Sequence, residues 1–161
     1  MTTVNIYSDG DFKRLKGELS TATHVKVWNC PNLEALPEMP NTTGVLVKNC
    51  PNLTAMPPLP NATEVWVWNC PSLATLSDMP ISTHVWVENC PGLKAMPDLP
   101  KATSVWVILC PGLEALPDMP NATEVLVKDC PNLAALPDMP NATYVRVWNC
   151  PKIGEVDWKD E

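Results

Sequence analysis

A cysteine followed by a proline recurs every 20 residues, and this spacing constrains the fold more than any other feature of the chain. The seven cysteines are Cys30, Cys50, Cys70, Cys90, Cys110, Cys130 and Cys150. A fixed period of about 20 to 50 residues indicates a solenoid, in which each coil buries its apolar side only against its neighbours. The 161 residues have room for a single such domain, residues 1–161, with repeats over 21–150 and caps over 1–20 and 151–161.

Each repeat has two halves with different patterns. In the coil that contains Cys130, the residues Thr123, Val125 and Val127 share one side of the chain, which predicts a short, half-buried strand. The second half of each coil carries prolines, which exclude a helix and a strand interior and favour an extended, polyproline-like segment with turns. Stacked in register, the coils predict a right-handed, mainly β repeat solenoid with one parallel sheet.

The repeat resembles that of the leucine-rich-repeat family, whose pattern is LxxLxLxx(N/C)xxLxxLPxLP. Ala122 stands at the first leucine of that pattern, and Cys130 stands at the Asn-or-Cys position. Over residues 21–156 the 20-residue period and the LP-x-(L/M)-P end are similar to the short repeats of bacterial type III effectors. That family's extra helical cap and catalytic ligase domain have no counterpart here. The resemblance implies a horseshoe with its sheet on the concave face, and a binding role.

The two ends are expected to cap the stack. Residues 2–7 repeat the strand pattern, Asp9-Gly10 is expected to turn the chain, and residues 11–19 have helical spacing with Asp11 as the N-cap. The apolar face of this short capping helix would contain Phe12, Leu15 and Leu19. At the other end, Ile153 and Val156 are expected to fill core columns and Trp158 to cover the last coil, with Asp160 and Glu161 in solvent. With the strand of the N-terminal cap and one strand in each of the seven repeats, we expect eight parallel strands.

The charge argues against two classes of partner. The net charge is −7, from 18 acidic and 11 basic residues, with no basic run that could displace counterions from phosphates. We therefore expect neither nucleic acid nor an anionic membrane surface as a partner. Residues 1–15 lack the apolar core of a signal peptide, and no apolar run approaches the roughly 20 residues of a membrane span. The expected location is the cytoplasm, or the cytosol of a host into which the protein is delivered.

Catalysis and cofactor binding have little support in the sequence. The cysteines are interpreted as a buried column of thiols that donate weakly to backbone carbonyls, because paired metal-binding motifs such as CxxC are absent. The two histidines, His24 and His84, lie three coils apart, and there is no glycine-rich phosphate loop. We expect no enzyme activity, no cofactor and no metal.

The outward side chains of the strands predict a binding surface. The column between the two valines reads Lys26, Leu46, Trp66, Trp86, Trp106, Leu126 and Arg146. The next outward column adds Trp28, Trp68, Ile108 and Trp148, and the preceding one adds Tyr144. An exposed apolar strip with a polar rim is typical of contact sites, and tryptophan and arginine are enriched at their hot spots. A non-catalytic module that binds a protein or peptide is the favoured interpretation.

Three other interpretations of this surface remain open. The tryptophans could stack only to stabilise the sheet. They could bury a homo-oligomer interface, through the concave face or the edge strands, in a structural repeat protein made by duplication or design. They could also form an aromatic platform for sugar rings.

The threonine column from Thr23 to Thr143 also has two interpretations: its hydroxyls either bond the backbone or form an outward array. In the fifth coil, Ile108-Leu109 replaces the usual residue pair before cysteine.

Overall fold

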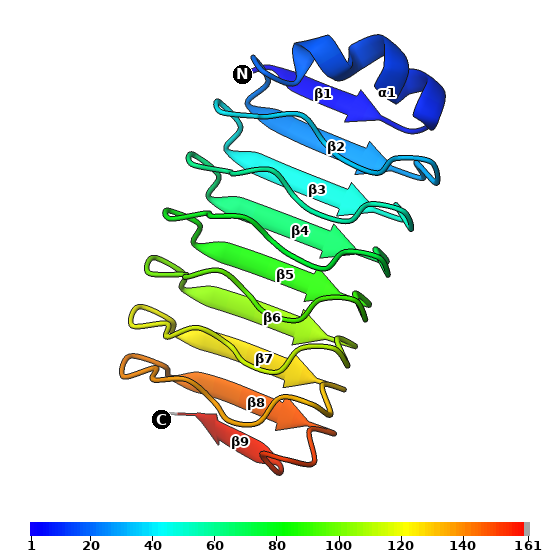
Figure 1. Cartoon of the computed structure of the whole chain (residues 1–161). Helices are drawn as coiled ribbons and strands as arrows, with labels where there is room; N and C mark the ends of the chain where they lie inside the picture. The colour runs from blue at the N-terminus through cyan, green and yellow to red at the C-terminus, as the bar shows by residue number, and fades with distance from the viewer. Residues whose placement is uncertain (160–161) are drawn as a thin grey trace.

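The computed structural model describes residues 1–159, which form a mainly β solenoid of about seven turns (Figure 1). The N-terminal cap consists of strand β1 (Thr3–Ile6), helix α1 (Asp9–Leu15) and a 3-10 turn (Lys16–Glu18). The repeats contribute the strands β2 (His24–Trp28), β3 (Gly44–Lys48), β4 (Glu64–Trp68), β5 (His84–Glu88), β6 (Ser104–Ile108), β7 (Glu124–Lys128) and β8 (Tyr144–Trp148). Strand β9 (Val156–Lys159) follows the last repeat.

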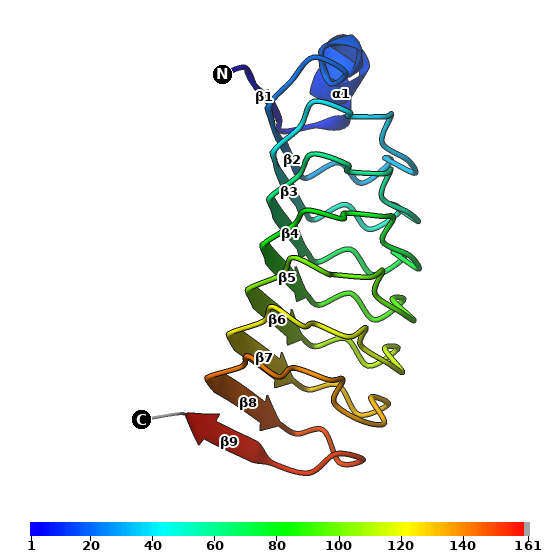
Figure 2. The ribbon, with the colours of Figure 1, turned by 90° about the vertical axis from the view of Figure 1, so that its left-hand side faces the viewer.

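Strands β1 to β8 pair in parallel and in strict register, so each residue lies beside the residue 20 positions further along in the repeats. The sheet forms one side of the stack and the return segments form the other (Figure 2). The return segments pass in front of the sheet in Figure 1, which makes the coil right-handed. The predicted parallel solenoid with extended return segments is confirmed.

The C-terminal end differs from the prediction. A ninth strand is present, and β9 pairs antiparallel with β8, so that Val156 lies beside Val147. Gly154, with φ of 91°, allows the chain to reverse. An antiparallel neighbour needs only a short turn, whereas a parallel one needs a further crossover. Ile153 and Val156 pack against the core as expected. The predictions for the Trp158 side chain, Asp160 and Glu161 lie outside the described part of the chain.

The core consists of columns that run the length of the stack. The two valines of each repeat strand are 0–3% exposed, and the leucine and methionine columns of the return segments lie opposite them. The return segments also pair with each other through single bridges that join Ala35, Ala55, Thr75, Ala95 and Ala115. All seven cysteines are buried, and each thiol donates to the carbonyl two residues earlier, at 3.2 to 3.5 Å. The interpretation of the cysteines as structural thiols is confirmed.

The residue before each cysteine has a left-handed backbone. Its φ lies between 51° and 56° in all seven coils, a conformation that asparagine adopts more readily than most residues. The side chains form an amide ladder: Asn49 donates to Asn29, Asn69 to Asn49 and Asn89 to Asn69, at 2.8 to 2.9 Å. Leu109 interrupts this ladder, with φ of 55°.

The threonine hydroxyls bond the backbone, which confirms the first of the two interpretations of this column. The hydroxyl of Thr43 donates to the carbonyl of Thr23 at 3.0 Å, and the same bond recurs in each following coil up to Thr143. The preceding residue of each coil, at the bend before the strand, has a hydroxyl in two coils. The hydroxyl of Thr42 donates to the carbonyl of Ala22, and that of Ser82 donates to the carbonyl of Ala62. These hydroxyls therefore join one coil to the next.

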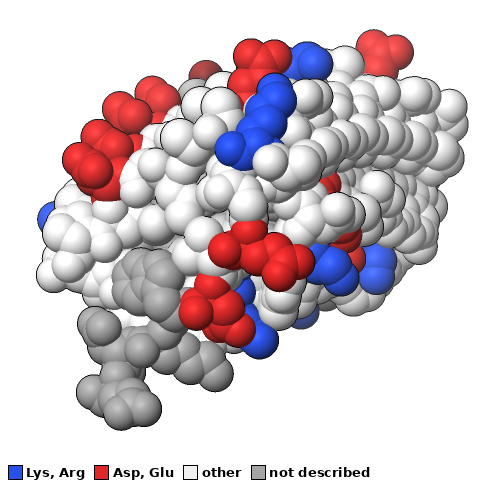
Figure 3. All heavy atoms as spheres, turned by 90° about the horizontal axis from the view of Figure 1, so that it is seen from below, with Lys and Arg blue, Asp and Glu red and all other residues white. Residues whose placement is uncertain are grey.

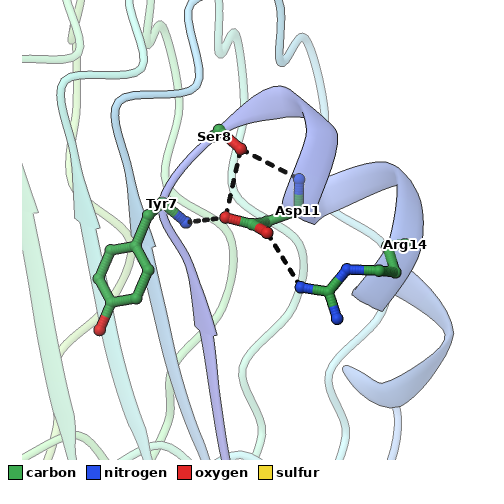
Figure 4. Close-up of polar contacts among 4 residues, drawn as sticks. All are labelled: Tyr7, Ser8, Asp11 and Arg14. Atoms are coloured by element: carbon green, nitrogen blue, oxygen red, sulfur yellow. Dashed lines mark hydrogen bonds and ion pairs between the residues drawn. The ribbon is translucent and has the colours of Figure 1, made fainter.

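The capping helix begins earlier than predicted. Ser8 is the N-cap, and its hydroxyl accepts from the backbone N–H of Asp11 at 3.1 Å (Figure 4). The predicted N-cap, Asp11, lies inside the first turn, and its carboxylate accepts from the backbone N–H of Tyr7 at 3.2 Å and from Arg14 at 3.0 Å. Asp9 and Gly10 are helical residues rather than a separate turn. The helix also ends before the predicted residue 19, because a 3-10 turn follows Leu15. The three predicted apolar residues still face the core: Leu19, beyond the turn, is buried, and Phe12 and Leu15 pack against it while partly buried.

Candidate functional site

Four tryptophans on neighbouring strands touch one another on the outward face of the sheet. Trp66 and Trp68 on β4 are nearly parallel, with 9° between their planes and centroids 6.3 Å apart. Trp86 on β5 meets Trp68 edge to face at 5.1 Å and 73°. Trp106 on β6 continues the series, 4.8 Å from Trp86 and inclined by 55°. We call Trp66, Trp68, Trp86 and Trp106 the tryptophan strip.

The strip borders a hollow of about 190 Å³ on the surface. Its lining is Glu64, Trp66, His84, Val85, Trp86, Ser104 and Trp106. Strand geometry explains the grouping, because side chains two residues apart share one face of a sheet and parallel strands in register place equivalent side chains side by side. Three indole rings line the hollow, and Glu64 contributes a carboxylate.

Hydrogen bonds divide the tryptophans into two groups. The indole N–H of Trp106 donates to the carboxylate of Glu124 at 3.2 Å, and Ser104 donates to the same carboxylate at 3.4 Å. The indole nitrogens of Trp28, Trp68 and Trp86 are covered and have no hydrogen-bond partner among the described residues. A covered donor without an acceptor costs about 1–3 kcal/mol. These unpaired donors offset part of the stability that the ring contacts of the same tryptophans contribute.

Cations of the chain cover some of the aromatic rings. The ammonium of Lys48 lies 5.3 Å from the ring centroid of Trp68. The guanidinium of Arg146 lies 4.2 Å from the ring of Trp148 and 5.7 Å from that of Tyr144, and it forms an ion pair with Asp157 at 3.3 Å. Among the side chains of residues 1–157, no such contact involves the three rings that line the hollow.

The other predicted site residues lie on the same face but apart from the hollow. Trp28 contacts Tyr7 of the N-terminal cap, with ring centroids 5.3 Å apart. Leu46 is only 8% exposed, next to Trp66 in the register. At the two ends of the column, Lys26 is exposed and Arg146 is half-buried. The half-buried residues Ile108, Leu126, Tyr144 and Trp148 lie on β6, β7 and β8.

Sequence reasoning missed several residues of this face. Glu64 and His84 line the hollow, and Glu124 holds Trp106, yet none was among the predicted contact residues. Their signal was their position two residues before the central tryptophan column, on the same side of each strand. Tyr7 was missed because the cap was treated only as a cover, although Ile6 pairs with Val27 and so places Tyr7 beside Trp28.

Charge is distributed unevenly around the stack. Viewed from the end nearest β9, a row of acidic side chains follows the return side, while charges of both signs lie on the sheet side (Figure 3). The exposed acidic column of the return segments contains Glu38, Asp78, Asp98, Asp118 and Asp138. Within residues 1–159, no three His, Cys, Asp or Glu side chains are grouped as a metal site would require.

Three thiols in the later coils resist ionisation. Burial raises the pKa of Cys90 and Cys130 to about 12 and that of Cys110 to about 11. Since the thiolate is the nucleophile, a raised pKa lowers the reactivity of these three thiols in the folded chain. Neither helical segment of the described residues has the length and apolarity needed to cross a bilayer.

Comparisons of the chain with protein-family models, with curated proteins and with solved structures give no match. The site is therefore interpreted from its own geometry. That geometry combines an aromatic strip, a hollow of side-chain size and a small number of carboxylates on a rigid parallel sheet.

Proposed function

We propose that the chain is a non-catalytic repeat module that binds a protein or peptide through the tryptophan strip. The proposal includes a leucine-rich-repeat organisation, with the sheet as the concave face of a horseshoe and the strip near its centre. A parallel sheet in strict register supports this role, because it holds each outward side chain at a fixed spacing. Seven unpaired thiols favour a reducing compartment such as a cytosol.

The observation that carries the proposal is a comparison between equivalent positions. In the central outward column, Leu46 and Leu126 occupy the places that Trp66, Trp86 and Trp106 occupy in the middle coils. Leucine therefore fits the fold at these positions. The middle coils instead carry larger rings, and the indole N–H of one of them, Trp86, is covered and has no hydrogen-bond partner among the described residues. Residues that lower stability and that the packing of the fold does not require are typical of binding sites.

A selection experiment tests the proposal. A displayed library of random peptides is selected on the wild-type protein and counter-selected on a triple variant, with Trp66, Trp86 and Trp106 changed to Leu. We expect the enriched peptides to bind the wild type at least ten-fold more tightly than the triple variant in calorimetry. Thermal denaturation of the triple variant is the control, and a cooperative transition shows that the variant is folded.

Two other results would assign a different function to the tryptophan strip. A dimer in light scattering that the triple variant loses would assign the strip to self-association. Quenching of tryptophan fluorescence by glycans, with no enriched peptide, would assign it to carbohydrate binding. Peptides that bind the wild type and the triple variant equally would remove the strip from the binding site altogether.

A further inference from the structure

We propose that the hollow lined by Trp66, Trp86 and Trp106 is an aromatic cage for a methylated ammonium group, such as a methylated lysine side chain of the partner. This inference rests on the proposed function, because it names the chemical group that a bound peptide inserts. The hollow holds about 190 Å³. That is smaller than the roughly 300–1,000 Å³ of a pocket for a drug-sized ligand, so it suits one side-chain head group.

The rings stand as walls rather than as a flat platform. Trp66 is nearly parallel to Trp68, at 9°, and Trp68 is steeply inclined to Trp86, at 73°. Trp66 and Trp86 are therefore steeply inclined to each other, and Trp106 adds a third plane at 55° to Trp86. A sugar ring stacks on one flat aromatic face, whereas a compact cation is attracted by several ring faces at once. Tryptophan attracts cations most strongly among the aromatic residues.

The charges around the hollow favour a cation. Glu64 lines it directly, and Glu124 is held at its edge by hydrogen bonds from Trp106 and Ser104. The whole chain carries a net charge of −7, which adds long-range attraction for a cationic ligand. His84 is the one lining residue that could oppose a cation, and its ring contacts the hydroxyl of Thr83 at 2.9 Å.

Other aromatic rings of the same face already hold cations. Lys48 covers Trp68, and Arg146 covers Trp148. Within the described residues, no lysine or arginine makes such a contact with Trp66, Trp86 or Trp106. The rings of this face thus bind cations where the chain supplies them, and the hollow has the same rings without a cation of its own.

The few acceptors in the hollow select the methylated form. A primary ammonium carries three N–H donors and loses water when it enters an apolar site. The lining offers the Glu64 carboxylate, but the Ser104 hydroxyl already bonds Glu124 and the His84 ring already contacts Thr83, and the remaining surface is indole and valine. A trimethylammonium group has no N–H donor to satisfy, and its methyl groups pack against the indole rings while its charge is retained.

Choline and its neutral isostere, 3,3-dimethylbutan-1-ol, test the charge preference directly, because the two molecules have the same shape. Both are titrated into the wild-type protein while NMR follows the indole N–H signals. We expect choline to bind at least ten-fold more tightly than the alcohol and to shift the signal of Trp86. Equal binding of the two probes would overturn the inference.

Two isosteric variants test the carboxylate. Glu64→Gln removes one charge inside the hollow, and Glu114→Gln removes one charge from an exposed position on the return side. We expect Glu64→Gln to weaken choline binding at least three-fold and to leave binding of the alcohol unchanged, with little effect from Glu114→Gln. Equal effects of the two variants on choline would contradict a role for Glu64. Neither change touches the core, so both variants fold.

The failure of this inference can be separated from the failure of the proposed function. Peptides that need the tryptophan strip, together with no preference for choline, would leave the proposed function standing and remove only the cage. Charge-selective binding of choline, without any peptide that depends on the strip, would keep the cage and remove the peptide partner. A trimethyllysine peptide that binds more tightly than its lysine counterpart by ten-fold or more would support both.

Discussion

Leu109 occupies in the fifth coil the left-handed backbone position that Asn89 occupies in the fourth, with φ of 55° against 52°. A left-handed backbone costs an ordinary residue about 1–2 kcal/mol, and asparagine tolerates it because its amide bonds locally. Asn89 donates to Asn69, but its own side-chain oxygen has no counterpart amide in the next coil. Leu109 therefore combines backbone strain, 43% exposure and a broken ladder.

The substitution Leu109→Asn is expected to raise the free energy of unfolding by about 1–2 kcal/mol. Asparagine relieves the strain, and its amide can donate to Asn89, a hydrogen bond worth about 0.5–1.5 kcal/mol. Urea denaturation measures the difference. Leu109→Ala is the control, since alanine keeps the strain and adds no amide, and it should not stabilise the chain. An unchanged or lower stability of Leu109→Asn would show that the interruption is not strained.

Much of the fold could be predicted from the sequence because each position of the repeat occurs in several coils, and each occurrence is a separate check on the prediction. One ambiguous strand is weak evidence, but the same alternation in seven coils fixes the register and the inward columns. The two errors lie where the repeat ends. Residues 8–11 occur only once, so no repeat tested the prediction of Asp11 as the N-cap, and Ser8 occupies that position instead. The tail formed an antiparallel strand because Gly154 allowed a tight reversal.

The candidate site was predictable in outline only. Register places the four rings of the tryptophan strip on one face, and the sequence contains that register. The tilt of each ring is decided by contacts between side chains, such as the hydrogen bond from Trp106 to Glu124. Because the hollow depends on those tilts, its presence could not be predicted from the sequence, although the place of Glu64 on the same face could.

Removal of the helix cap should loosen the N-terminal coil. Ser8→Ala deletes the hydroxyl that accepts from Asp11, and loss of an N-cap costs about 1 kcal/mol. Hydrogen exchange of the amides in β1 and α1 should speed up more than that of the amides in β5. Ser20→Ala is a matched control, because it removes a hydroxyl that donates only to the carbonyl of Gly17 and leaves the backbone carbonyl that accepts from Asn41 in place. Equal exchange in both variants would contradict the role of Ser8.

The same cap should weaken in acid. The hydrogen bond from Arg14, followed by that from the backbone of Tyr7, holds the pKa of Asp11 below its ordinary value. A carboxyl with a lowered pKa stabilises the fold above its unfolded pKa, near 4, and loses that effect as pH falls through the folded value. The protection of the α1 amides, measured against their intrinsic exchange rates, should therefore fall below about pH 4 in the wild type and depend less on pH in Asp11→Asn.

The thiol column should make stability fall at high pH. Burial raises the pKa of Cys110 from its ordinary value of 9.0 to about 11, so the unfolded chain releases this proton first. Stability is complete below about pH 9 and falls as pH rises towards 11, by at most about 1.4 kcal/mol per pH unit for each such thiol. Urea denaturation between pH 8 and pH 11 should give a shallower decline for Cys110→Ala than for the wild type. Parallel declines would mean that this thiol titrates normally.

The structural share of the tryptophan strip can be separated from its binding role by comparing Trp86→Leu with Trp28→Leu. Both substitutions replace an indole whose N–H is covered and unpaired with leucine, the residue that Leu46 supplies in the column of Trp86. Trp86 contacts two rings, at 5.1 and 4.8 Å, whereas Trp28 contacts one, at 5.3 Å. Since an aromatic pair adds about 0.5–1.5 kcal/mol, Trp86→Leu should cost that much more free energy of unfolding than Trp28→Leu. A difference well above this range would mean that the strip chiefly stabilises the sheet.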